Sequence, residues 1–275
     1  MTGAVQPLKN VTLEPCDLAD LRYAKSLLEN PGFAVRLAGL LGAPLERGFK
    51  MLPANWSQTI QGAVNKALHT ALRVATTSLR SKGRNERASL GFHRVIAGVS
   101  GGIGGAFGFI ALPIELPFST TVMLRSIADI ARSEGHDLQD TETRLACLEV
   151  FALGGRSTSD DAAENAYWAM RAVLASTISE AAAHLARHGL ARESAPALVK
   201  FISVIAARFG VIVSEQVAAK AVPLVGAAAG SVVNVLFTSH FQSMARGHFI
   251  VRRLEKSYGP RIVREVYDQL VLPAA

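Results

Sequence analysis

The chain has 275 residues, of which 49% are apolar, 19% are charged and 7% are aromatic, and its net charge is +7. This length can bury a large core, and a mean hydropathy of +0.25 predicts helices that bury much surface or lie against lipid. Two cysteines, Cys16 and Cys147, exclude a disulfide framework or a cysteine-based metal site, and the few aromatic residues, without zinc-finger or basic-region spacing, argue against nucleic acid.

Helical patterns follow one another along the chain, whereas alternating strand patterns and hairpin turns are scarce. The expected helical segments are 16–30, 32–52 with a break near Pro44, 55–80, 118–135, 140–155, 159–189, 196–223 and 224–259, with a short tail at 260–270. The sequence therefore predicts an all-α fold. We expect one multi-helix bundle, with parts at 17–94, 95–155 and 156–275 and two long glycine-rich apolar segments in or near the core.

Several of these segments carry capping signals at their ends. Asp17 and Ser159 are expected N-caps, since short polar side chains accept hydrogen bonds from the first free amides of a helix. Gly135 is expected just past the end of the 118–135 segment, and Gly189 just past the 159–189 segment, where a left-handed backbone favours glycine. The opening residues lack the charged-then-apolar pattern of a signal peptide, which predicts a cytoplasmic location.

The stretch from Val95 to Pro117 reads VIAGVSGGIGGAFGFIALPIELP and is uncharged as far as Glu115. Its length is close to that of a membrane-spanning helix, and a second uncharged run covers 221–245. Both runs contain small residues four apart, a spacing that lets two helix backbones approach closely in membranes and in soluble cores alike. The sequence leaves three alternatives open: a buried core hairpin, interfacial insertion, or a true span.

Two short patterns indicate candidate chemistry. Gly98-Val99-Ser100-Gly101-Gly102 matches G-x-S-x-G, in which a serine on a sharp strand-to-helix turn is the nucleophile of a hydrolase. That turn belongs to a parallel sheet, for which the chain offers few strands. Glu180, His184 and His188 lie four apart on one expected helix face and are candidate metal ligands, although histidines at a helix C-terminus also suit the helix dipole.

Charged residues near the uncharged runs are candidate binding residues. Glu115 stands between Pro113 and Pro117, either as an N-cap of the following helix or as a polar contact to a lipid or partner. Arg125 and Asp129 are spaced to pair on one helix face. Basic residues flank each run, at 73–94 and at 246–264, and the second group includes Arg246, Arg252 and Arg253. This arrangement suits contact with an anionic leaflet, or otherwise a solvated helix face.

Long composite patterns resemble the EcsC family of bacterial proteins. They are ALPIELPFSTTVMLRSIADIARSEGHDLQDTETRLACLEVFALGG at 111–155, KAVPLVGAAAGSVVNVLFTSHFQSMARGHFIVRRLE at 220–255 and NPGFAVRLAGLLGAPLERGFKMLP at 30–53. The resemblance implies a helical fold. The family is named after a gene cluster that encodes an ABC transporter, and no established reaction or catalytic residue comes with it.

The sequence thus favours a membrane-associated module that binds lipid or protein on the cytoplasmic side, at the inner face of the cell membrane. Its expected partners are an anionic membrane surface or a membrane transporter, with no cofactor and no nucleic acid, and the oligomeric state stays open. A serine hydrolase that uses Ser100 and a soluble scaffold are the two alternatives.

Overall fold

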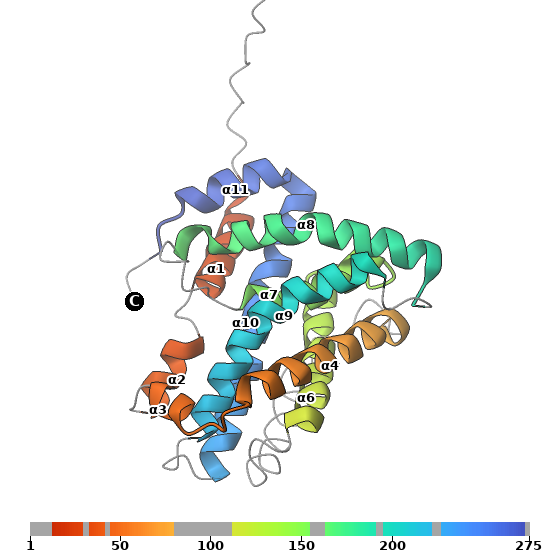
Figure 1. The fold of residues 1–275 in the computed structure, drawn as a ribbon. Coiled ribbons are helices and arrows are strands. Elements are labelled where there is room, and N and C mark those ends of the chain that lie inside the picture. The colour runs from red at the N-terminus through yellow and green to blue at the C-terminus, as the bar shows by residue number, and fades with distance from the viewer. Residues whose placement is uncertain are drawn as a thin grey trace, which may run out of the picture.

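The computed structural model describes residues 13–29, 33–41, 45–79, 112–154, 163–190, 195–221 and 227–272. Its regular elements in these ranges are α-helices that pack on one another, which confirms the predicted all-α fold (Figure 1). They are α1 (Pro15–Leu28), α2 (Phe33–Leu41), α3 (Leu45–Lys50), α4 (Trp56–Thr77), α6 (Leu112–Ser133), α7 (Thr141–Leu153), α8 (Ala163–His188), α9 (Pro196–Ala221), α10 (Ala227–Tyr258) and α11 (Pro260–Gln269).

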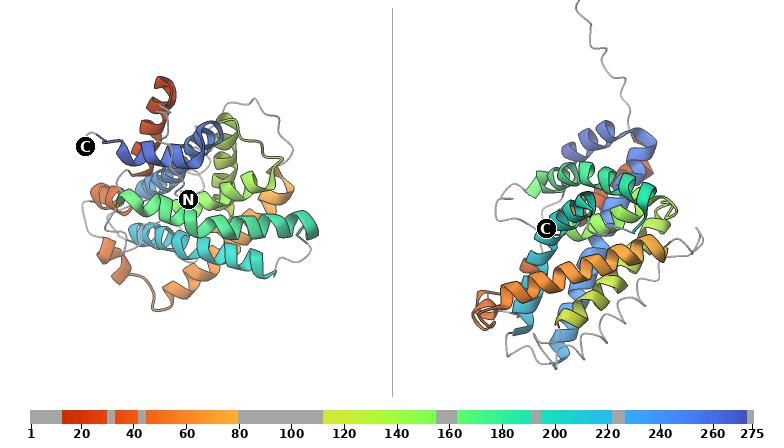
Figure 2. Two further views of the ribbon diagram at one scale, coloured as in Figure 1. Left: turned by 90° about the horizontal axis from the view of Figure 1, so that it is seen from above. Right: turned by 45° about the vertical axis from the view of Figure 1, so that its right-hand side comes forward.

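The longest of these helices, α10, is the axis of the bundle. It runs from the lower end of the molecule to the top and packs against α1, α2, α6, α7, α9 and α11 (Figure 1). Helices α8 and α9 lie side by side across it (Figure 2). Since α10 is surrounded by helices along most of its length, even polar side chains such as Asn234, His240 and Gln242 are buried on it.

Phenylalanines from three helices form the centre of the main core. Phe151 of α7 lies 5.0 Å from Phe209 of α9 and 5.3 Å from Phe241 of α10, measured between ring centroids. Phe237 adds an edge-on contact to Phe241 at 5.2 Å. Such tilted and edge-to-face pairs contribute about 0.5–1.5 kcal/mol each beyond the area they bury. A second, smaller core joins α1, the first part of α8, the last part of α10 and α11, around residues such as Trp168, Leu254 and Tyr267.

Helix ends follow the sequence signals in part. The carboxylate of Asp140 accepts hydrogen bonds from the backbone N–H groups of Glu142 and Thr143 and so caps α7. Gly135 and Gly189 have φ values of 80° and 58°, the left-handed conformation that was expected at these two helix ends. One start was predicted wrongly. Helix α1 begins at Pro15 with Glu14 as N-cap rather than Asp17, while the expected N-cap Ser159 lies outside the described residues.

Helix α6 begins at Leu112, six residues before the expected start at Phe118. Pro117 lies inside the helix near its first turn, where a missing N–H removes a single bond to the Pro113 carbonyl. Glu115 is therefore a residue of the first helical turn rather than an N-cap, and its side chain is free to contact neighbouring helices.

The two uncharged runs have different outcomes. Residues 95–111 lie outside the described residues, whereas most of the run at 221–245 forms the first half of α10, with Val233, Phe237 and Phe241 buried. In the described part of the chain, one helix is long and apolar enough to cross a membrane by length and composition. It is α9, whose best window has a hydropathy of 1.9 and is 44% buried. A core helix passes the same test, so this finding is weak evidence for a span.

Candidate functional site

Glu115 joins three helices at the lower end of the bundle. Its Oε1 atom lies 3.0 Å from Nζ of Lys220 on α9 and accepts a hydrogen bond of 3.3 Å from Nδ2 of Asn234 on α10. Asn234 in turn accepts a hydrogen bond of 2.7 Å from Nε2 of Gln216. Glu115 and Lys220 are 13% and 18% exposed, so this pair is shielded from most solvent. The contact fixes the start of α6 to the end of α9 and the start of α10.

Both glycine-rich runs of the sequence meet the described structure at this place. Residues 95–111 lead directly into α6, and residues 222–226 connect α9 to α10. Helix α3 also packs here, because a Cβ atom added at Gly48 would lie only 2.0 Å from the carbonyl oxygen of Ala218 on α9. The lower end in Figure 1 is thus built by α2, α3, the last turns of α9 and the first turns of α6 and α10.

Large apolar side chains are exposed at this end of the molecule, which we call the apolar end. Two of them are on α6, where Ile114 is 77% and Phe118 53% exposed. They are four residues apart and share one helix face. Val35 on α2, Met51 next to α3 and Val232 on α10 are also exposed. An exposed apolar group of this kind is typical of an interaction site.

The basic residues at 246–264 are engaged within the protein. Arg246 pairs with Glu134 at 3.1 Å, Arg252 with the buried Glu149 at 3.7 Å, and Arg253 with Asp20 at 2.6 Å. Three further basic residues also have partners. Lys256 contacts Nδ1 of His136, which follows α6, while Arg261 pairs with Glu265 and Arg264 with Asp268, each one turn further along α11. Much of this positive charge therefore ties α10 to α1, α6 and α7.

Arg125 and Asp129 bind different partners. Nη2 of Arg125 donates a hydrogen bond of 3.0 Å to Oγ of Ser78 at the end of α4. Asp129 pairs instead with Arg132, one turn further along α6. Arg132 is 6% exposed, and its Nη2 atom also reaches the carbonyl oxygen of Leu79. Both interactions hold α6 against the end of α4.

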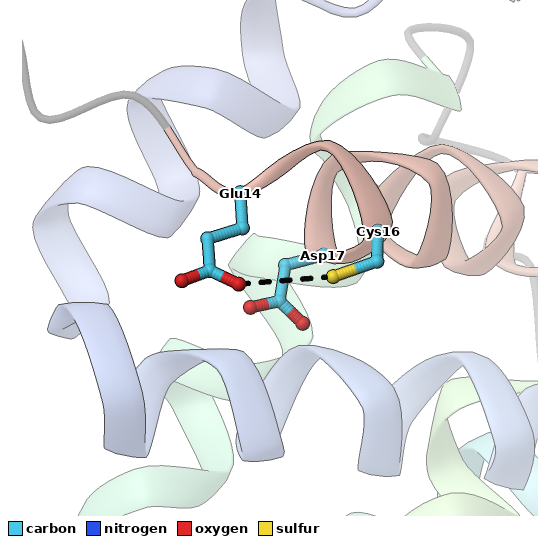
Figure 3. A group of neighbouring side chains, drawn as sticks. All are labelled: Glu14, Cys16 and Asp17. Atoms are coloured by element: carbon cyan, nitrogen blue, oxygen red, sulfur yellow. Dashed lines mark hydrogen bonds between the residues drawn. The ribbon is translucent and has the colours of Figure 1, made fainter.

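The candidate metal ligands on α8 are close in space but differ in their contacts. The rings of His184 and His188 stack with centroids 4.8 Å apart, while the exposed carboxylate of Glu180 lies 3.6 Å from Nζ of Lys200 on α9. In the described part of the chain, the one group of three potential ligand atoms within 4.8 Å of one another is elsewhere, at Glu14, Cys16 and Asp17 (Figure 3).

The Glu14 group lies at the exposed start of α1. The Cys16 thiol points to Oε2 of Glu14 at 3.9 Å (Figure 3). Oδ2 of Asp17 accepts a hydrogen bond of 2.6 Å from the Tyr258 hydroxyl. Carboxylates at a helix N-terminus stabilise the helix dipole without any ion. The geometry is explained by the helix start, and it does not identify a metal centre.

A buried polar network joins α7, α8 and α10. Glu149 is 2% exposed, and its Oε2 atom lies 3.4 Å from Nε2 of His248, which is fully buried. The Tyr167 hydroxyl contacts Nδ1 of the same histidine at 3.1 Å. Beside it, Arg171 donates two hydrogen bonds, of 2.7 and 2.9 Å, to the carboxylate of Glu255. This network brings several titratable side chains together in the core.

Burial sets the protonation states of this network. Burial raises the pKa of Glu149, but His248, Arg171 and Arg252 outweigh it, so the pKa of Glu149 lies below its usual value. Burial also lowers the pKa of His248 despite the facing carboxylate. Glu149 and His248 thus form a buried pair beside Arg171 and Arg252, and the Tyr167 hydroxyl shares a hydrogen bond with Nδ1 of His248. These contacts tie α7, α8 and α10 together.

One acid stands apart from these pairs. Glu215 on α9 is half-buried, and burial raises its pKa to about 7. A carboxylate in this state changes charge near neutral pH, since no neighbouring cation offsets the cost of burial.

Similarity to known proteins assigns this chain to a family. The model of the EcsC protein family matches residues 24–254, from the middle of α1 almost to the end of α10. The chain belongs to the EcsC family. A search of the curated proteins and a search of the solved structures each found no match.

The EcsC match includes the Glu115 contact, the apolar end and the Glu149–His248 pair, and it leaves out α11. Ser100 falls within the match but lies outside the described residues, and these residues contain none of the strands that a nucleophile elbow needs. Sequence reasoning on this EcsC chain missed Glu149 and His248. The signal was available: Glu149 is a lone carboxylate inside the apolar run LACLEVFAL, as Glu115 is in its own run.

Proposed function

We propose that this EcsC protein is a binding module that attaches peripherally to a membrane through its apolar end. The observation that supports the proposal is the exposure of Ile114 and Phe118 at the point where the uncharged run 95–111 enters α6. An apolar sequence and an exposed apolar helix face are thereby continuous along the chain. Lipid is the partner that accepts both without requiring a specific surface shape.

The internal pairing of the arginines changes the physical basis of this proposal. The sequence alone favoured an electrostatic contact between 246–264 and anionic lipid. Arg246, Arg252 and Arg253 are instead paired with carboxylates of other helices, so they contribute less to a membrane contact. We therefore propose that apolar insertion contributes most of the binding free energy. The inner face of the cell membrane remains our proposed location, and a membrane transporter our proposed neighbour there.

Vesicle flotation tests the proposal. The double variant Ile114→Ser/Phe118→Ser removes the two most exposed apolar side chains of α6. Since burying one such side chain is worth about 1.5–3 kcal/mol, we expect the vesicle partition coefficient to fall by more than about tenfold. The matched control is Val173→Ser/Val199→Ser, which changes exposed apolar residues on α8 and α9. This control should bind vesicles like the unaltered protein.

The lipid composition of the vesicles separates the two physical mechanisms. Apolar insertion predicts similar binding to phosphatidylcholine vesicles and to vesicles that contain phosphatidylglycerol, with little loss at high salt. Binding that requires the anionic lipid and disappears at high salt would instead assign the membrane contact to the basic residues. Equal binding of the α6 variant and the control would refute the role of the apolar end, and no vesicle binding at all would favour a soluble scaffold.

A further inference from the structure

A cavity of about 400 Å³ lies between the end of α4, the first turn of α7 and the end of α8. This volume is in the range of small-molecule sites. Polar residues of α4 and α7 line one side, and Leu185, Ala186 and Leu190 line the other. Helix α6 separates the cavity from the apolar end, because the turn that follows α6 forms one wall and Glu115 lies in its first helical turn. The cavity is thus independent of the membrane proposal.

Arg144 provides the charge of this cavity. The side chain is 5% exposed, and Nη1 donates hydrogen bonds to the carbonyl oxygens of Leu138 and Gln139 at 3.1 and 3.2 Å. Nη2 donates to Oγ1 of Thr141 at 2.8 Å. These bonds fix the orientation of the guanidinium plane, which is the property that lets arginine recognise planar or tetrahedral oxyanions. Among the described residues that line the cavity, Arg144 carries the charge.

The hydroxyl groups of the wall complete the polar side. Because Thr141 accepts the bond from Arg144, its own hydroxyl proton can be donated toward the cavity. Thr76 and Thr77 donate their protons to carbonyl oxygens of α4 and present lone pairs to the cavity. The nearby Asp140 carboxylate is occupied by bonds from Glu142 and Thr143. Burial raises the pKa of Asp140, but these hydrogen bonds outweigh burial, so the pKa lies below its usual value.

We propose that this cavity binds a small organic oxyanion, a carboxylate or a phosphate monoester that carries a hydroxyl group and a short apolar part. The charged group faces Arg144 and Thr141, the ligand hydroxyl donates to Thr76 or Thr77, and the apolar part lies on Leu185 and Leu190. Free metabolites and lipid headgroups of the phosphate monoester type share this chemistry.

Thermal unfolding of the full chain tests the site with four probes: inorganic phosphate, glycerol 3-phosphate, butyrate and neutral glycerol. A ligand at ten times its Kd should raise the unfolding midpoint by about 3–6 °C. The anionic probes, led by glycerol 3-phosphate, should raise it, and glycerol should not. No shift with any anionic probe, or an equal shift with glycerol, would overturn the proposal.

Two variants assign the effect to the cavity. Ala186→Phe places a ring in the cavity from an exposed helix position and should abolish the shift, whereas Ala183→Phe, one turn away on α8 and outside the lining, should retain it. Thr141→Val removes one hydroxyl and should weaken binding by about tenfold. A shift that is unchanged in Ala186→Phe and Thr141→Val would refute the site.

Vesicles with phosphatidic acid separate the two sources of ligand. If Ala186→Phe binds these vesicles more weakly than Ala183→Phe does, the ligand of the cavity is a lipid headgroup. If the two variants bind vesicles equally and Ala186→Phe loses the glycerol 3-phosphate shift, the ligand is a free metabolite.

Discussion

The ion pair between Arg171 and Glu255 supports a quantitative prediction about stability. Both side chains are largely buried, at 19% and 10% exposure, and the two hydrogen bonds of 2.7 and 2.9 Å form a bidentate contact. The guanidinium also lies 5.3 Å from the ring centroid of Trp168. Arg171→Met keeps most of the aliphatic volume but leaves the Glu255 charge buried without its partner. We expect a loss of about 3–5 kcal/mol in the free energy of unfolding.

A double-mutant cycle shows whether this loss comes from the unpaired charge. Arg171→Met/Glu255→Met removes both charges, so it should be more stable than Arg171→Met alone by at least about 1 kcal/mol. The assay is urea unfolding followed by circular dichroism. Arg261→Met is the control, because the Arg261–Glu265 pair is exposed and should be worth less than about 1 kcal/mol. The reasoning is refuted if Arg171→Met costs no more than this control, or if the losses in the double variant simply add.

Three further predictions use the same unfolding assay. Gly48→Ala should destabilise the protein by about 1–3 kcal/mol or more, because its Cβ would overlap the Ala218 carbonyl. Gly62→Ala, with open space around it, should stabilise the protein by about 0.5–1 kcal/mol. The reverse order of stabilities would contradict the α3–α9 packing. Burial lowers the pKa of His240 to about 4, so the unfolded chain takes up its proton first as the pH falls below 6.5. Stability should therefore fall by about 2 kcal/mol between pH 7 and 5 on its account, and a His240→Gln variant with an undiminished pH dependence would disprove this. Burial raises the pKa of Glu215 to about 7, so Glu215→Gln should stabilise by about 2 kcal/mol more at pH 8 than at pH 5, and a gain independent of pH would exclude the mechanism.

The helices of this protein could be predicted because their signals are local. Apolar periodicity and the break near Pro44 located the early helices closely, and the segment expected at 140–155 forms α7, which Asp140 caps. The start of α6 could not be found this way. Whether Pro117 ends a helix or is tolerated within its first turns depends on what the helix packs against, which sequence spacing does not contain.

The partners of the charged residues were less predictable for the same reason. A basic group at 246–264 has the same sequence pattern whether it faces lipid or the carboxylates of α1, α6 and α7. The pairing of Arg253 with Asp20 spans more than two hundred residues of sequence, and only the packing of α1 on α10 brings the two together. The isolated acid Glu115 was singled out by its apolar surroundings, but its contacts with Lys220 and Asn234 come from the fold.

The polar side chains of α10 have a consequence for how the bundle finds a single arrangement. Asn234, His240, Gln242 and His248 are all buried, and each meets a partner on a neighbouring part of the bundle: Glu115 and Gln216, the Gly154 carbonyl, Ser126, and Tyr167. A smooth apolar helix could slide along its neighbours by one turn, about 5.4 Å, at little cost. Here the same slip would orphan four polar groups at about 1–3 kcal/mol each, a total comparable to the whole stability of a domain. The buried polar contacts of α10 therefore select one register of this helix against its neighbours.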